Sequence, residues 1–164
     1  TLVTYHADCL PVYLYDPAHQ AIALLHAGWR GTVDNIVSAG LEKMRKAYGT
    51  RASDVIAGIG PGISAACYET SEAVRILFAE TFTDRDMERI FTEPHLGEDG
   101  ARHWQLDLAL ANHLLLQNAG VQEISDGGIC TYRNAKRLFS HRAQGAKRGL
   151  NAAFLGLPEE GGAR

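Results

Sequence analysis

Two apolar runs separated by a short turn constrain the fold of this 164-residue chain more than any other feature. The runs cover residues 10–15 and 21–26, and Asp16-Pro17 interrupts the chain between them. Short apolar runs bounded by turn residues are typical of strands, and an interval of about four to five residues suits a hairpin. Antiparallel pairing would bring the start of the first strand beside the end of the second. Cys9 and His26 are therefore predicted to meet at one end of the hairpin.

The remaining periodicity predicts a mixture of helices and short strands. Apolar residues at intervals of three and four predict helices from Thr32 to about residue 48, over 71–82 and over 105–118, with a helical turn near 87–91. Short apolar runs predict strands over residues 1–5, 55–59, 129–132, 138–140 and 152–155. This order predicts an α+β fold, a layered α/β/α sandwich with mixed sheets.

Length and composition predict one globular domain. The chain has a mass of 17.8 kDa, with 46% hydrophobic and 21% charged residues. We expect this domain to cover residues 1–157 and the Gly-rich residues 158–164 to form a disordered tail. The chain begins without Met and inside an apparent strand, so an N-terminal portion is expected to be missing.

Charge and cysteine content exclude several classes of protein. A net charge of -3 argues against a nucleic-acid partner, and no apolar run is long enough for a membrane span. The three cysteines are far apart and odd in number, which favours a reducing compartment. Free thiols fit the cytoplasm, so a cytoplasmic location is expected, and no signal peptide is visible.

Cys9 and His26 are the residues most suited to chemistry. A thiolate and an imidazole that lie close together can bind a metal such as zinc, or can form a nucleophile and its base. The alternative is structural, because free cysteines are among the most buried residues of proteins.

The segment after His26 has the composition of an anion site. Gly28 and Gly31 would let the backbone approach a ligand closely, and Arg30 offers a fork of donors that suits phosphate. The helix expected from Thr32 would add its positive N-terminal end. Trp29 suits a core anchor better than a ligand contact.

Other candidate residues carry weaker signals. The Gly-rich residues 58–62 fit a tight turn better than a nucleotide-binding loop, because the spacing differs and Pro61 lacks an N–H donor. Cys67 has no ligand partner at short spacing and is assigned to packing. Arg142 could hold an anion, although a structural arginine is the default.

Several motifs together resemble one known family. They are Ala-Asp-Cys-Leu-Pro-Val from Ala7, His-Ala-Gly-Trp-Arg-Gly from His26, Gly-Pro-Gly-Ile followed by Cys-Tyr-Glu, then Asp-Leu, Cys-Thr and Ser-His-Arg. In this order, over nearly the whole chain, they resemble the YfiH-like family, also called the laccase-domain or multicopper polyphenol oxidase-type family.

This resemblance implies a layered α/β fold and a specific activity. Members are purine nucleoside phosphorylases that convert inosine, adenosine or methylthioadenosine and phosphate into free base and ribose 1-phosphate, with accompanying adenosine deaminase activity. They bind zinc through two His and one Cys, at a site once assigned to copper. The resemblance places the catalytic and metal-ligating residues at Cys9 and His26. Combined with the residue analysis, it assigns phosphate binding to Arg30, Gly31 and Arg142.

The chain departs from the family pattern at the remaining metal ligand. That histidine belongs to an N-terminal Gln-Val-His-Gly motif, which this sequence does not contain. His6 is close to Cys9 in sequence, but strand alternation would turn it to the other side.

Three other functions remain as alternatives. A copper polyphenol oxidase would need more ligands, and neither methionine lies near the motifs. A cysteine hydrolase would use Cys9 and His26 as nucleophile and base. A vestigial, non-catalytic domain would expose apolar surface and would therefore tend to form a homo-oligomer.

Overall fold

The hairpin predicted from the two apolar runs is the centre of the fold in the computed structural model, which describes residues 1–92, 94–97 and 99–158. Strand β2 (Leu10–Asp16) pairs antiparallel with β3 (Ala21–Ala27), and Pro11 lies opposite His26. The carboxylate of Asp16 closes the turn by accepting hydrogen bonds from two backbone N–H groups. The pairing places the Cys9 end of β2 beside the His26 end of β3, as predicted.

Two further strands extend this hairpin into a sheet. Strand β4 (Ile56–Ile59) pairs antiparallel with β2, and β8 (Glu123–Asp126) pairs parallel with β4. In the described residues the strand order is β3-β2-β4-β8. Val12 and Leu14 are fully buried between this sheet and the helices, so they anchor the core.

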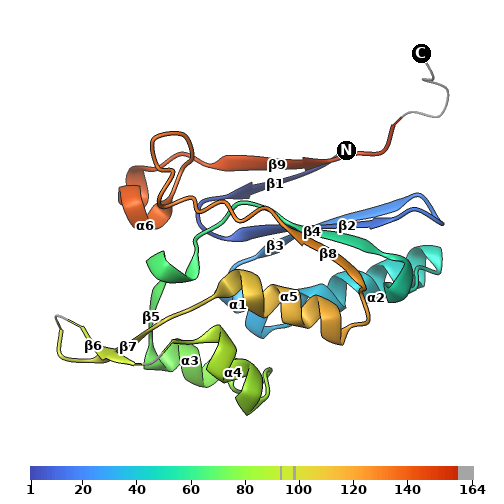
Figure 1. Ribbon diagram of the computed structural model, residues 1–164. Helices are drawn as coiled ribbons and strands as arrows, with labels where there is room; N and C mark the ends of the chain where they lie inside the picture. The colour runs from blue at the N-terminus through green and yellow to red at the C-terminus, as the bar shows by residue number, and fades with distance from the viewer. Residues whose placement is uncertain (93, 98, 159–164) are drawn as a thin grey trace.

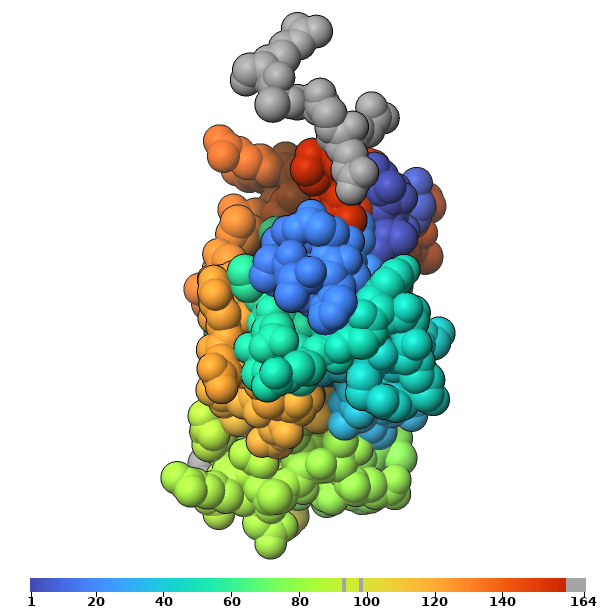
Figure 2. Space-filling model, turned by 90° about the vertical axis from the view of Figure 1, so that its right-hand side faces the viewer, coloured from blue at the N-terminus to red at the C-terminus, as the bar shows by residue number. Residues whose placement is uncertain are grey.

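The two faces of the sheet are covered differently. Helices α1 (Trp29–Val33), α2 (Ile36–Tyr48) and α5 (Leu108–Asn118) lie on one face (Figure 1). On the other side, the first strand β1 (Leu2–His6) pairs antiparallel with the last strand β9 (Asn151–Leu155), and both contact β3. Figure 2 shows these layers from the turn end of the hairpin.

A smaller unit lies beyond the helices. Its elements are β5 (Glu69–Ser71), α3 (Glu72–Phe78), α4 (Asp84–Ile90), β6 (His95–Leu96) and β7 (Arg102–Gln105). β7 pairs antiparallel with both β5 and β6, and α4 packs against α5. This unit therefore connects to the main sheet through α5.

Short helical segments complete the described structure. They are α6 (His141–Gln144) and the 3-10 turns Ala52–Asp54, Ala65–Cys67 and Gly145–Lys147. In the described ranges no helix is long and apolar enough to cross a membrane.

The α+β class predicted from the sequence is confirmed. Two predicted strands are wrong, because residues 129–132 and 138–140 form turns and bends and only Cys130 makes an isolated bridge. The tail predicted over residues 158–164 falls almost entirely outside the described residues.

The predicted helix start at Thr32 is also wrong. The helix begins at Trp29, and Thr32 is buried inside α1, where its hydroxyl donates to the Gly28 carbonyl and accepts from Asn112. Asn35, in the left-handed conformation with φ 50°, then separates α1 from α2. Because α1 has only five residues, it does not supply the long helix dipole that the anion hypothesis invoked.

Candidate functional site

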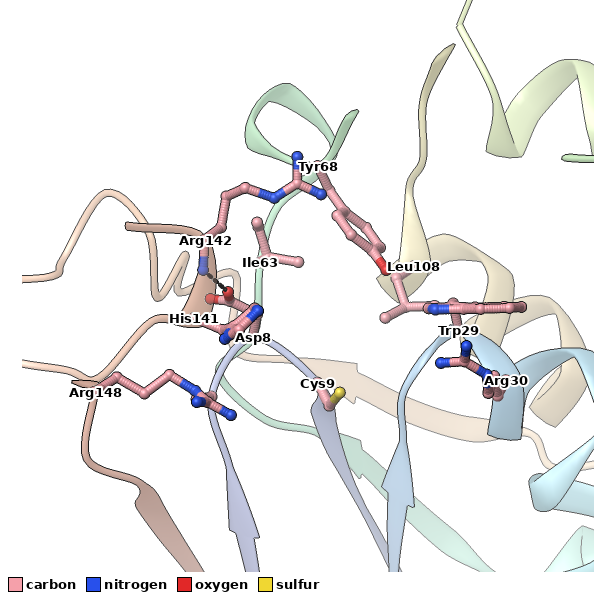
Figure 3. A pocket seen from close by; sticks show the side chains of 11 residues that line it. Asp8, Cys9, Trp29, Arg30, Ile63, Tyr68, Leu108, His141, Arg142 and Arg148 are labelled. Carbon is pink, nitrogen blue, oxygen red and sulfur yellow. Dashed lines mark hydrogen bonds between the residues drawn. The ribbon is translucent and has the colours of Figure 1, made fainter. Parts of the chain in front are cut away.

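A cavity of about 340 Å³ opens at the Cys9 end of the hairpin. Its walls come from the β1–β2 junction, the start of α1, the segment before β5, the start of α5 and the segment around α6 (Figure 3). The lining residues are Ala7, Asp8, Cys9, Trp29, Arg30, Ile63, Tyr68, Leu108, His141, Arg142 and Arg148. Segments far apart in the sequence therefore meet at the predicted site.

Cys9 and His26 face a common point at this end of the hairpin. A Cβ atom built on Gly28 would lie 2.8 Å from Cys9 Sγ and 4.0 Å from His26 Nε2. The glycine thus leaves room between a thiol and an imidazole, which confirms that the pairing brings them together. Burial raises the pKa of the Cys9 thiol, and the Asp8 charge adds to this, while Arg148 opposes it.

His6 lies beside this pair rather than on the opposite side. Its ring stacks on that of His26, with centroids 4.5 Å apart and planes 13° from parallel. The predicted orientation is wrong because Asp8, with φ 81°, interrupts strand alternation between β1 and β2. Burial, followed by the neighbouring His26, lowers the pKa of His6 to about 4.

Asp8 connects the hairpin end to the C-terminal part of the chain. Its Oδ1 accepts a 2.7 Å hydrogen bond from the Thr131 hydroxyl, and its Oδ2 accepts one of 2.7 Å from the Arg142 backbone N–H. Both carboxylate oxygens are therefore engaged, and Asp8 acts as a positioning residue for the C-terminal wall.

The predicted anion-binding residues occupy different places. Arg30 lines the cavity with its guanidinium 4.2 Å from the centre of the Trp29 ring. Arg142 also lines it, 5.5 Å from the centre of the Tyr68 ring. Gly31 is not part of the lining; a Cβ there would approach the His26 carbonyl at 3.3 Å, so its small size serves backbone packing.

Tyr68, His141 and Arg148 line the cavity but are not among the site residues predicted from the sequence. Tyr68 and His141 belong to the motifs Cys-Tyr-Glu and Ser-His-Arg, but their spacing in the sequence does not indicate that they lie near Cys9. Arg148 belongs to no motif noted in the sequence. Burial, followed by the nearby Cys9, raises the pKa of Tyr68 to about 12, so its phenol stays protonated and can donate a hydrogen bond.

The described donors fit a metal ion only in part. Cys9 and His26 offer sulfur and nitrogen, a combination that suits zinc, and the Gly28 gap gives them a shared space. Within the residues that the structure describes, no three His, Cys, Asp or Glu side chains are arranged to hold a metal. Among the described residues, these two are thus an incomplete ligand set.

A family model described as "Multi-copper polyphenol oxidoreductase laccase" matches residues 1–158. The chain belongs to this laccase-domain family. The family resemblance carried by the Asp-Cys-Leu-Pro and His-Ala-Gly-Trp-Arg-Gly motifs is therefore confirmed.

Named relatives and solved structures agree with the laccase-domain assignment. Purine nucleoside phosphorylase YlmD of Bacillus subtilis is 34% identical over 93% of this chain and 53% of the relative. A purine nucleoside phosphorylase of Bacteroides thetaiotaomicron is 43% identical over 87% of this chain and 52% of the relative. The structure of Bacillus licheniformis hypothetical protein YfiH has a TM-score of 0.81 and 30% identity, covering 92% of this chain and 55% of that one. The chain thus spans about half the length of the curated relatives it matches.

Proposed function

We propose that this laccase-domain protein is a purine nucleoside phosphorylase. Its substrates would be inosine, adenosine or methylthioadenosine together with phosphate, and its products a free purine and a ribose 1-phosphate. Adenosine deamination is proposed as an accompanying activity. The names of the relatives support the phosphorylase assignment, and the chemistry of the cavity supports it independently.

The observation that carries the proposal is the cationic character of the cavity. Arg30, Arg142 and Arg148 line it, and Asp8, the one carboxylate that lines it among the described residues, already has both oxygens hydrogen-bonded. A guanidinium group can donate two parallel hydrogen bonds to two oxygens of a phosphate, so this wall suits an inorganic phosphate.

The same cavity also offers an apolar surface that suits a purine. Trp29 and Tyr68 supply aromatic surface, and Ile63 and Leu108 supply aliphatic surface in the same cavity. A flat, apolar base with polar edges stacks favourably on such side chains. One cavity therefore offers surfaces suited to both the anionic and the aromatic substrate.

This arrangement suits phosphorolysis. A phosphate oxygen would form a bond to ribose C1′ while the bond from C1′ to the purine nitrogen breaks and its electron pair passes to the base. The sugar becomes cation-like in the transition state, so a dianionic phosphate held against it stabilises that state. The arginines would fix the phosphate, and the aromatic residues would fix the base.

Cys9 and His26 are proposed as two ligands of a zinc ion, with copper as the alternative metal. A zinc ion held by these two residues would lower the pKa of a bound water, which is the chemistry that deamination requires. The contribution of the chain itself is to hold the thiol and imidazole on either side of Gly28.

The test is hypoxanthine release from inosine by the complete protein, with any residues that flank this chain, in the presence and absence of phosphate. Phosphate-dependent release in the wild type, lost in Cys9→Ala and kept in the control Cys67→Ala, is the expected result. Cys67 is the matched control because it does not line the cavity. Release that does not require phosphate, or no release at all, would refute the phosphorylase assignment.

A further inference from the structure

Arg148 enters the cavity from a part of the chain that the sequence motifs did not indicate. It follows the 3-10 turn Gly145–Lys147 and precedes β9, and its side chain extends toward Cys9 below Asp8 and His141 (Figure 3). It is thus positioned by the last strand of the fold.

The three cavity arginines differ in the contacts that their guanidinium groups make. The Arg142 guanidinium donates to the Glu69 carbonyl at 2.8 Å and lies over Tyr68, and that of Arg30 lies over Trp29. Both are thereby held against the protein.

Arg148 lacks such an attachment. Its Nε is buried and has no hydrogen-bond partner among the described residues. A buried cationic N–H without an acceptor is costly, so this group favours an anion that can reach it.

Neighbouring groups do not supply that anion. Asp8 is the carboxylate of the cavity lining, and its oxygens accept from Thr131 and the Arg142 backbone. Cys9 lies close enough for its charge state to be affected by Arg148, but burial favours its neutral thiol. Among the described residues, no acceptor is hydrogen-bonded to the Arg148 Nε, which therefore stays available to a ligand in the cavity.

We propose that Arg148 is the principal phosphate-binding residue of the cavity, donating from Nε and one Nη to two oxygens of inorganic phosphate. This inference rests on the proposed function for the identity of its ligand. It shifts the main phosphate contact from the Arg30 and Gly31 segment to the C-terminal wall, where Asp8 holds the backbone of Arg142 in place. Arg30 then acts mainly on the aromatic side of the cavity, against Trp29.

The test measures binding of radiolabelled inorganic phosphate to the complete protein by equilibrium dialysis. Arg148→Gln should weaken phosphate binding by about tenfold to a hundredfold, the range for losing charged hydrogen bonds. Arg148→Lys should restore only part of the affinity, because an ammonium does not reproduce the paired donors. Arg137→Gln, an exposed arginine outside the cavity lining, is the matched control and should change binding less than about twofold.

Steady-state kinetics supply the second readout. In Arg148→Gln the KM for phosphate should rise by a similar factor, while the KM for inosine stays within about threefold. Circular dichroism checks that each variant is folded. If Arg148→Gln does not fold, Arg148→Lys provides the test of the proposal, and its phosphate affinity must be lower than that of the wild type.

Three outcomes would overturn the inference: wild-type affinity in the folded Arg148 variant, loss of binding in Arg30→Gln alone, or no phosphate binding by the wild type. Failure of the proposed function is a separate result. If the wild type binds phosphate through Arg148 but does not cleave inosine, the phosphate site stands and the phosphorylase assignment falls.

Discussion

Replacing Gly28 by alanine should separate the geometry of the site from the stability of the fold. Gly28 has φ -83° and ψ 175°, which alanine adopts without strain. The new Cβ would lie 2.8 Å from Cys9 Sγ, whereas nonbonded heavy atoms of this size prefer about 3.5–4.0 Å. The thiol must therefore move by roughly 1 Å, and Nε2 of His26, at 4.0 Å, is not forced to move.

A displacement of about 1 Å should lower the unfolding free energy only moderately but should reduce activity strongly. Overpacking a site costs about 1–3 kcal/mol of unfolding free energy, and a displacement of about 1 Å at a reacting centre can reduce activity about a hundredfold. The assays are chemical denaturation, zinc content and the kcat/KM for inosine in the presence of phosphate. Gly28→Ala should lose zinc and activity while remaining folded.

Gly58→Ala is the matched control for this substitution. A Cβ there meets its nearest neighbour, Ser125 Oγ, at 3.7 Å, which is an ordinary contact. Both zinc content and activity should be unchanged in the control. If Gly28→Ala retains zinc and activity within about twofold of the wild type, the space in front of Cys9 is not part of the site.

Three further substitutions test the supports of the fold. Asp8→Asn should lower the unfolding free energy by about 1–3 kcal/mol in urea denaturation, because an amide cannot accept from both Thr131 and the C-terminal backbone; an unchanged midpoint would contradict this. Burial alone would raise the pKa of Asp16, but hydrogen bonds, including one of 2.8 Å with His19, hold it below its usual value. The resulting stabilisation is present above about pH 4 and is lost as the pH falls, so Asp16→Asn should flatten the acid decline of stability between about pH 5 and 2. Phe78→Ala, at a fully buried ring, should cost about 3–5 kcal/mol in the same denaturation assay, and a cost below about 1 kcal/mol would show that the core refills the space.

Local patterns were sufficient where neighbouring segments pair with each other. The hairpin of β2 and β3 was predictable because its strands and turn lie within one short stretch, and their alternation fixes which side chains face the helices. Residues 129–132 have strand-like composition but form turns. The strand formed just before this stretch, β8 (Glu123–Asp126), contains one apolar residue, Ile124, and is fixed by parallel pairing with the distant β4. That pairing leaves no local signal in the sequence.

The same distinction between local and long-range contacts separates the site residues that the sequence predicts from those that it does not. The sequence places Cys9 and His26 together because a hairpin joins them, and it predicts the phosphate site in the adjacent segment for the same reason. Tyr68 and Arg148 reach the cavity through contacts between segments separated by 59 and 139 residues from Cys9, counted along the numbering. The residue type at one position does not indicate which distant segment it contacts. These residues could therefore be assigned to the cavity only from the structure.

Asp8 explains how one residue next to Cys9 controls both the near and the far wall of the cavity. Its φ of 81° lies in the left-handed region, which Asp tolerates better than most residues. That bend ends the alternation of β1 and allows His6 to stack on His26. At the same bend, the Asp8 carboxylate accepts hydrogen bonds from the Thr131 hydroxyl and the Arg142 backbone N–H, which anchor the C-terminal wall. The strained residue therefore has a structural reason: it joins the hairpin end that carries Cys9 to the segment that delivers Arg148.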